Sequence, residues 1–356
     1  DQIKETFYFE DNNTTLTNKG FLIHCKEKYV LKQDTFSIPP DSSLNEEELN
    51  NKELITQIKS NGFYFLVLTN KKNVYTFQLN WYDHSIFIPK QIHIMNDKRE
   101  HQLISQISAG LGHSILLTTN GEVYSYGKNG KGQCGVGDLE EETIYAPRKI
   151  NFSNLSKDDS IKQISASNNF NVVLTSHGKV YCWGENMELQ CGIANKKTIT
   201  IPTEIEFKLK NDEQIVTIDT KANQAVAFTN RNSCYMWGLC KKKIHNRFYK
   251  ESTPIQALYP LHVALVYKKL SIARQLMTLN NLNRIDELGR SPLLIACILG
   301  LREIVNDLLH IKYSDKFKMP LNCSKFKTLV DVASYQGFLD LVQLFLDHGI
   351  RGSKFS

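Results

Sequence analysis

The stretch that decides the fold is SAGLGHSILLTTNGEVYSYG, residues 108–127, because it recurs as SASNNFNVVLTSHGKVYCWG at residues 165–184. In each copy an apolar run meets a short turn whose glycine allows positive φ, and a second run, Val-Tyr-x-aromatic-Gly, alternates its large side chains. This pattern is typical of a β-hairpin. We therefore predict hairpins at Ile115–Gly127, at Val172–Gly184 and, from a further copy, at Val226–Gly238.

Aligning the copies on a shared threonine gives five repeats along the first 250 residues. The spacings are 52, 49, 57 and 54 residues, and the anchors are Thr17, Thr69, Thr118, Thr175 and Thr229. A four-stranded sheet of this length cannot bury both of its faces alone, so such units pack radially as propeller blades. Trp183 and Trp237 occupy equivalent inner-strand positions, which predicts that both indole rings are buried.

The third and fourth copies resemble the repeat of the regulator of chromosome condensation family. They share Gly-x-Val-Tyr-x-aromatic-Gly at 121–127 and 178–184, followed by Gln-Cys-Gly at 133–135 and 190–192. The resemblance implies a seven-bladed propeller. Since five copies are visible, either further blades precede Asp1 or the array is short and is capped by the domain that follows. The family's signature histidine occurs at His113, and the equivalent positions hold Asn12, Tyr64, Phe170 and Gln224.

A second pattern, with helical periodicity, starts after Pro254. Three units spaced 32 and 37 residues apart begin with Tyr259–Ala264, Ser291–Ala296 and Thr328–Ala333, and a longer amphipathic segment follows each start. The pattern resembles the ankyrin repeat, which implies stacked helix pairs. In that motif His262 has a structural role, tying a turn to a helix.

Together the two patterns predict a multi-domain chain that is first all-β and then all-α. A propeller-type domain of about five repeats, which form either a closed or an incomplete ring, covers residues 1–250. An ankyrin-repeat solenoid of about three repeats covers residues 251–356. The basic run Lys241–Lys243 between them indicates a solvated linker.

Three motifs could suggest catalysis or metal binding, and each has a simpler explanation. Gly130–Gly135 matches Gly-x-Gly-x-x-Gly, but no helix start follows it, so we interpret it as a blade loop. Asp83, His84 and Ser85 are adjacent and cannot make both hydrogen bonds of a triad. The eight cysteines have neither Cys-x-x-Cys nor zinc-ligand spacing. We predict no enzyme activity, no cofactor and no metal, with free thiols in a reducing compartment, cytoplasmic or nuclear.

Two clusters of charged residues are candidates for protein binding. The first could bind a cation or a basic partner, although a solvated blade connection explains it more simply: Asp138, Glu140, Glu141 and Glu142. The second lies at a predicted ankyrin hairpin tip: Arg284, Asp286, Glu287 and Arg290. The sequence reveals no structural role for these four residues, and contact with a partner and solubility of the turn explain them equally well.

Charge and hydropathy limit the classes of partner. Most of the formal net charge of +6 falls in residues 250–356, which carry 14 Lys and Arg against 9 Asp and Glu. So weak a basic bias does not indicate specific nucleic-acid binding. No apolar run is long enough to span a bilayer. We therefore predict a scaffold or adaptor that binds other proteins, such as a small GTPase or a larger assembly.

The alternative is a guanine-nucleotide exchange factor or regulator of a small GTPase, as the first resemblance implies. Exchange needs a protruding element, and the long blade connection Leu139–Ser160 is the only candidate. The start at Asp1, without methionine, indicates part of a longer protein. Abundant Asn, Lys and Ile indicate an AT-rich genome. If the source is an intracellular bacterium, we expect a secreted effector in the host cytosol.

Overall fold

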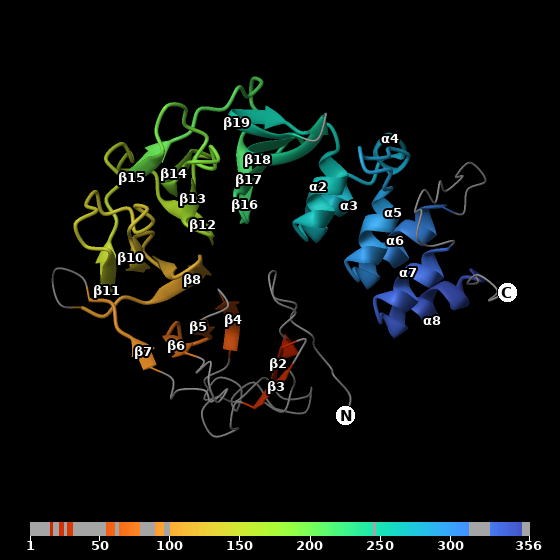
Figure 1. The fold of residues 1–356 in the computed structure, drawn as a ribbon, viewed down its shortest axis with the longest axis horizontal. Helices are drawn as coiled ribbons and strands as arrows, with labels where there is room; N and C mark the ends of the chain where they lie inside the picture. The colour runs from red at the N-terminus through yellow and green to blue at the C-terminus, as the bar shows by residue number, and fades with distance from the viewer. Residues whose placement is uncertain are drawn as a thin grey trace. The chain divides into compact units, whose positions relative to one another are not determined.

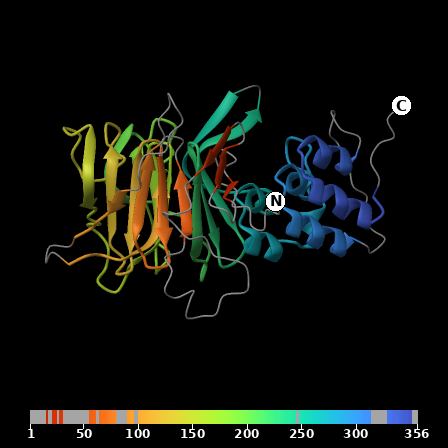
Figure 2. The same ribbon diagram turned by 90° about the horizontal axis from the view of Figure 1, so that it is seen from below.

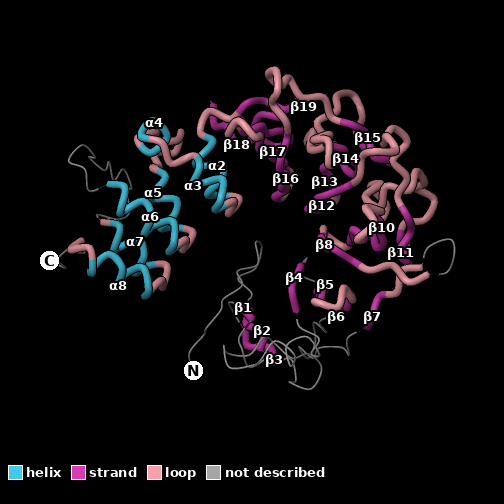
Figure 3. Tube along the Cα trace, turned by 180° about the vertical axis from the view of Figure 1, so that it is seen from behind, coloured by secondary structure: helices cyan, strands magenta, loops and turns pink. Residues whose placement is uncertain are grey.

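The computed structural model describes most of the chain from the second repeat onward (Figure 1). The described residues are 15–16, 21–24, 27–30, 55–60, 64–78, 90–95, 100–244, 247–312 and 328–350. Within them the chain forms strands up to Gln256 and helices from Pro260 onward (Figure 3). It divides into two compact units, one holding the strands up to Ala227 and the other the helices, while the residues of the last three strands are divided between the units.

Within the described residues the strands form one three-stranded sheet and four four-stranded sheets, seen side on in Figure 2. We number these sheets as blades in the order of the repeats, and in every blade consecutive strands are neighbours. The first blade holds β1 (Thr15–Leu16), β2 (Phe21–His24) and β3 (Glu27–Val30); the second β4 (Ile55–Ser60), β5 (Tyr64–Thr69), β6 (Val74–Gln78) and β7 (Lys90–Ile92); the third β8 (Ile104–Ala109), β9 (His113–Thr118), β10 (Val123–Lys128) and β11 (Thr143–Lys149); the fourth β12 (Ile161–Ser167), β13 (Phe170–Thr175), β14 (Val180–Glu185) and β15 (Thr198–Glu204); the fifth β16 (Ile215–Lys221), β17 (Gln224–Thr229), β18 (Cys234–Ile244) and β19 (Arg247–Gln256).

The three predicted hairpins are confirmed as β9–β10, β13–β14 and β17–β18. Gly130–Gly135 lies in the loop between β10 and β11, as we interpreted it. Two expectations were wrong. Lys241–Lys243 is not a linker, because the pairing of β18 with β19 carries strand β18 through it. Leu139–Ser160 is not one long connection, because β11 within it pairs with β10. The motif Asp83–Ser85 lies outside the described residues.

The second unit is helical, and its three predicted helix starts, after Tyr259, Ser291 and Thr328, are confirmed. Ser291 and Thr328 cap their helices by accepting the backbone N–H groups of Leu294 and Asp331. The described part of this unit has seven helices, none of them long and apolar enough to cross a bilayer: α2 (Pro260–Val266), α3 (Leu270–Gln275), α4 (Leu279–Leu282), α5 (Pro292–Ile298), α6 (Arg302–Lys312), α7 (Leu329–Tyr335) and α8 (Leu339–Asp347).

The expected length pattern of the helix pairs holds only in part. The second helix is the longer one for α5–α6, with 7 and 11 residues, and for α7–α8, with 7 and 9 residues. In the first pair α3 has 6 residues against 7 in α2. No ankyrin solenoid is evident from these helices, and the assignment to ankyrin repeats stays a prediction.

Trp183 and Trp237 are both fully buried, as the alignment predicted. Each indole ring packs on a glycine of the preceding blade, Gly135 for Trp183 and Gly192 for Trp237. A Cβ atom at Gly135 would lie 2.6 Å from Trp183 Nε1, and one at Gly192 would lie 3.1 Å from Trp237 Cδ1. Both glycines also have positive φ, +69° and +65°. The Gln-Cys-Gly loop of one blade therefore forms the seat for the aromatic ring of the next.

A glutamine that the sequence analysis missed links each blade to the next. Its Oε1 atom accepts a backbone N–H from the first strand of the following blade, which we call the inner strand. The pairs are Gln57 with Ile107 at 3.2 Å, Gln106 with Ile164 at 2.8 Å and Gln163 with Ile218 at 3.0 Å. In the fifth blade the equivalent residue is Thr217, whose hydroxyl donates back to Gln163 Oε1 at 3.0 Å. The inner strands are thus held in register by a repeated side chain.

A cross-strand ion pair occurs with reversed charges in neighbouring blades. In the third blade Lys149 on β11 pairs with Glu122, which also accepts a hydrogen bond from the hydroxyl of Tyr124. In the fourth blade Lys179 pairs with Glu204 on β15 at 3.6 Å. The geometry therefore accepts either order of charges at the ends of these strands.

Reversing one partner, Glu122→Lys, is expected to destabilise the protein by about 0.5–1 kcal/mol, because it places two lysines together at a partly exposed site. Adding Lys149→Glu should restore stability, because the fourth blade already carries that arrangement. Urea unfolding at low salt measures the effect. A double variant as unstable as the single one would contradict this account of the pair.

Candidate functional site

The acidic cluster predicted from the sequence lies in the loop between β10 and β11. We call this segment the acidic loop, and its four residues are exposed: Asp138, Glu140, Glu141 and Glu142. The buried Asn129 sets the shape of the loop. Its Nδ2 donates to the backbone oxygens of Asp138 at 2.7 Å and Glu141 at 3.2 Å, and its Oδ1 accepts the N–H of Cys134 at 3.2 Å. The acidic side chains are therefore carried by a fixed backbone.

The fourth blade has the same loop with the opposite charge. The buried Asn186 donates to the backbone oxygens of Ile193 and Lys196, both at 2.6 Å, and accepts the N–H of Cys191 at 2.9 Å. Where the acidic loop ends in Glu141 and Glu142, this loop ends in Lys196 and Lys197, both exposed. We call it the basic loop. The sequence analysis missed it, although aligning the two asparagines reveals it.

Contacts between the third and fourth blades place the acidic loop against the two strands that flank the basic loop, β14 and β15. Gly137 donates its N–H to the backbone oxygen of Thr200 at 3.0 Å. Lys131 lies 3.7 Å from the carboxylate of Glu185. Because strands alternate in direction, both loops lie at the same end of their blades. We call this surface the loop end, formed by the acidic loop and the basic loop together.

The carboxylates of the acidic loop do not converge on one point. Glu141 pairs with Arg148 at 2.7 Å, and Asp138 Oδ1 accepts the N–H of Glu140 at 2.7 Å. Within the described residues, Glu140 and Glu142 have no ion pair, and no group of three or more His, Cys, Asp or Glu side chains is placed to hold a metal ion. Contact of this cluster with a basic protein surface, like its role as a solvated blade connection, stays a prediction.

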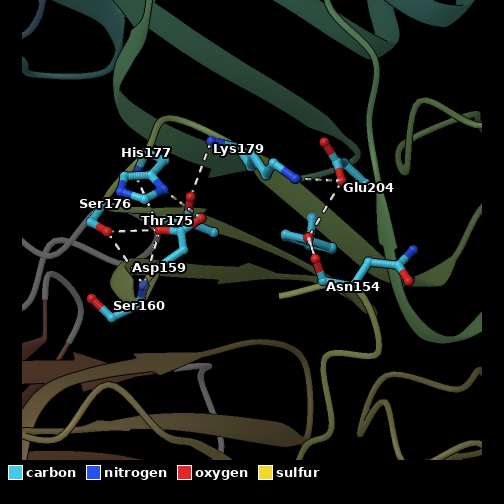
Figure 4. A network of polar contacts seen from close by, with 9 residues as sticks. Asn154, Asp159, Ser160, Thr175, Ser176, His177, Lys179 and Glu204 are labelled. Atoms are coloured by element: carbon cyan, nitrogen blue, oxygen red, sulfur yellow. Dashed lines mark hydrogen bonds and ion pairs between the residues drawn. The ribbon is translucent and has the colours of Figure 1, made fainter. Parts of the chain in front are cut away.

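A polar network that the sequence did not indicate lies at the opposite end of the fourth blade (Figure 4). Asp159, buried just before β12, accepts three hydrogen bonds at Oδ1: from the hydroxyl of Ser176 at 2.7 Å, from the N–H of His177 at 3.1 Å and from the N–H of Ser160 at 2.9 Å. The imidazole Nδ1 of His177 lies 3.8 Å from Oδ2. The network ties the connection before β12 to the turn between β13 and β14.

This network contains Asp, His and Ser but is not a catalytic triad. In a triad the histidine lies between the acid and the nucleophile, whereas here Ser176 donates directly to Asp159. Burial alone would raise the pKa of Asp159, but hydrogen bonds from Ser176, Thr175 and the backbone hold it below its usual value. The carboxylate is therefore ionised at neutral pH and acts as an anchor for the turn.

The predicted tip in the helical unit has structural roles that the sequence did not reveal. Asp286 accepts the backbone N–H groups of Leu288 and Arg290 and forms an ion pair with the Arg290 guanidinium at 2.7 Å. Arg284 donates to the backbone oxygen of Leu258. The turn therefore uses the side chains of Arg284, Asp286 and Arg290 as internal partners. Glu287 is exposed, and a binding role for the tip stays a prediction.

His262 is buried and links the first helix pair to the second. Its Nε2 lies 3.0 Å from the backbone oxygen of Arg290, and its ring packs against Tyr259 at a centroid distance of 5.4 Å. Burial lowers the pKa of His262, and the contact with Arg290 only partly offsets this. The neutral imidazole therefore serves as a structural tie between a turn and a helix, the role that the ankyrin resemblance implied.

The four-stranded sheets, the glutamine links and the Gln-Cys-Gly seats define a protein built from propeller-type repeats. Models of the Regulator of chromosome condensation (RCC1) repeat match residues 104–133 and 161–192 in one form, and 120–174 and 177–220 in another. The middle of the chain, residues 104–220, therefore consists of RCC1 repeats. This confirms the first resemblance in the part of the chain that carries the loop end.

Known proteins share these repeats over part of their length. The Ultraviolet-B receptor UVR8 of Arabidopsis thaliana is 33% identical over 135 residues, 38% of this chain and 29% of the receptor. The Secretion-regulating guanine nucleotide exchange factor of Bos taurus is 30% identical over 136 residues, 38% of this chain and 28% of that protein. The chain thus spans less than a third of these two relatives.

A solved structure supports the fold. The crystal structure of human WBSCR16 matches with a TM-score of 0.52 at 16% identity, covering 72% of this chain and 64% of that chain. At this identity the match concerns the fold, and it agrees with four-stranded blades arranged as in a propeller.

Proposed function

We propose that this chain is a protein-binding module whose RCC1-type blades contact a partner through the loop end. The observation that carries the proposal is the pair of buried asparagines, Asn129 and Asn186, which hold two exposed loops of opposite charge on rigid blades. Fixed loops lose little conformational entropy on binding, and opposite charges side by side select the orientation of a partner. Binding, rather than catalysis, is the activity that these features serve.

We also propose that the helix pairs after Tyr259 are ankyrin-type repeats that provide a second contact. Three features support this: the repeated Pro-Leu helix starts, the Thr328–Asp331 capping box and the tie from His262 to Arg290. Two recognition units in one chain fit an adaptor that holds one partner at two points or bridges two partners.

The partner class we favour is a small GTPase. One relative in the RCC1 part carries the name of a guanine nucleotide exchange factor, and this name supports regulation of a GTPase as the finer function. Exchange activity ranks second to binding, because Leu139–Ser160 contains β11 and the buried anchor Asp159. It therefore provides no protruding element within the described residues.

Affinity capture with loop variants tests the proposal. The full chain, the variant Glu140→Lys/Glu142→Lys and the variant Lys196→Glu/Lys197→Glu are used as baits in an extract of the native source, followed by quantitative mass spectrometry. We expect a protein enriched by the wild type to be reduced at least about tenfold with either variant, because charged contacts act within a Debye length. All four residues are exposed, so thermal unfolding should be unchanged.

Matched controls make the outcome decisive. Lys157→Glu and Lys210→Glu change exposed charges at the opposite end of the blades and should leave capture unchanged. Purified small GTPases, nucleotide-free and loaded with GDP, are then tested for direct binding. A partner captured equally well by the wild type and both loop variants would contradict a role of the loop end.

A further inference from the structure

The third and fourth blades are joined by a buried polar contact between three side chains and one backbone oxygen. His113 Nε2 lies 2.7 Å from Asn171 Oδ1, and Asn171 Nδ2 donates to the backbone oxygen of Gln133 at 2.7 Å. Trp183 Nε1 donates to the same oxygen at 3.0 Å. All four residues are at most 2% exposed. We call His113, Gln133, Asn171 and Trp183 the lock.

The contact between the fourth and fifth blades lacks this lock. Counted from the anchor threonines, the positions of His113 and Asn171 hold Phe170 and Ala225, so a hydrogen-bonded pair is replaced by an apolar pair. The remaining two positions hold Gln190 and Trp237, which are buried. In the described part of the chain, Gln190 Nε2 and Trp237 Nε1 have no hydrogen-bond partner.

Two links along the inner strands occur at both contacts, and each contact also has polar links of its own, such as Gly137 with Thr200 at the first and Asn168 with Asn223 at the second. At the first contact the indole N–H of the lock is paired, whereas the equivalent N–H at the second contact is not. Along the inner strands the shared links are Gln106 with Ile164 and Ser108 with Ala166 at the first contact, and Gln163 with Ile218 and Ser165 with Thr220 at the second. A buried donor without an acceptor gives up hydration when the contact closes and regains it when the contact opens. Opening is therefore favoured at the second contact.

From these observations we infer that the inner strands of the fifth blade, β16 and β17, separate from the fourth blade in the folded protein at a lower free energy than the fourth separates from the third. In repeat arrays stability is approximately a sum of intrinsic and nearest-neighbour terms, so the weakest neighbour contact opens first. A partner that binds the open state shifts this equilibrium before it disturbs the contact between the third and fourth blades.

Native-state hydrogen–deuterium exchange of the full chain, read by mass spectrometry, tests the inference. After correction for intrinsic rates, peptides within residues 215–227 should exchange at least about tenfold faster than peptides within 161–175, since one unpaired buried donor corresponds to about a tenfold change in an equilibrium. Equal protection of the two segments, or better protection of 215–227, would overturn the inference.

Substitutions at the lock positions test whether the lock, rather than fraying of the fifth blade, accounts for the difference in hydrogen exchange. The variant Asn171→Ala leaves the buried His113 Nε2 without its partner, and exchange within 161–175 should rise about tenfold while β4 and β5 stay unchanged. The variant Phe170→His/Ala225→Asn should slow exchange within 215–227. If it does not fold, the first variant decides: an unchanged rate within 161–175 would overturn the role of the lock.

Discussion

Replacing Trp183 with alanine is expected to lower the free energy of unfolding by about 3–5 kcal/mol, the usual cost of truncating a fully buried aromatic side chain. The ring is completely buried, lies on the Gly135 seat and meets the edge of Phe152 at a centroid distance of 6.0 Å. Trp237 has an equivalent position, with Gly192 as its seat and Phe207 at 5.5 Å. Its alanine variant should therefore lose a similar amount.

Phenylalanine variants should distinguish the two rings. Trp183→Phe removes the hydrogen bond from Nε1 to the Gln133 oxygen, whereas Trp237→Phe removes an indole N–H that has no partner among the described residues. Both changes leave similar space, so the first should cost about 1–3 kcal/mol more than the second. Urea unfolding of both variants measures the difference. Equal losses would show that the indole hydrogen bond contributes nothing to the joint between blades.

Lowering the pH from 7 to about 4 is expected to remove about 3 kcal/mol of stability through His113 alone. Burial lowers the pKa of His113 to about 4, and the contact with Asn171 offsets this only in part. The unfolded chain takes up the proton below a pH of about 6.5, whereas the folded protein resists it. The contribution is therefore complete above about 6.5 and declines as the pH falls through the folded pKa.

A variant without the imidazole isolates this contribution. His113→Phe/Asn171→Ala cannot titrate at this site and leaves no amide unpaired, because Phe170 and Ala225 show that the fold accepts the pair. Unfolding free energies at pH 7, 6, 5 and 4.5 should fall less steeply for the variant than for the wild type. Parallel curves would contradict a neutral, buried His113.

Sequence patterns predicted the features that depend on neighbours in the chain. The hairpin β13–β14 follows from an apolar run, a turn glycine at Gly178 and an alternating second run. The helix starting after Thr328 follows from a side chain that caps its own first turn. Burial of Trp183 and Trp237 followed from their shared position in the alignment.

Features that depend on distant residues were missed. His113 meets Asn171 across 58 positions, and no local pattern marks that pair. The glutamine links could have been found, because Gln106 and Gln163 both lie twelve residues before an anchor threonine. The anchor Asp159 could not, because its contact with Ser176 depends on how the connection before β12 folds back. The basic run at 241–243 was misread because charge suggested a linker while strand pairing decided the structure.

Of the candidate binding residues, the acidic loop was identified from the sequence but its basic counterpart was not. Consecutive carboxylates are easily noticed in a sequence. Lys196 and Lys197 are recognised as the counterpart of the acidic residues only when Asn186 is aligned with Asn129. In the helical unit no sequence pattern indicated that Asp286 and Arg290 bind each other, because their pairing depends on the turn that they build.

Cross-linking of a captured complex with a lysine-reactive reagent tests most directly the central claim, that partners bind at the loop end. The exposed lysines Lys131, Lys196 and Lys197 lie at the loop end, whereas Lys157, Lys179 and Lys210 lie at the opposite end of the same blades. The account predicts cross-links from the partner to the first group and none to the second. Cross-links confined to the second group would contradict it.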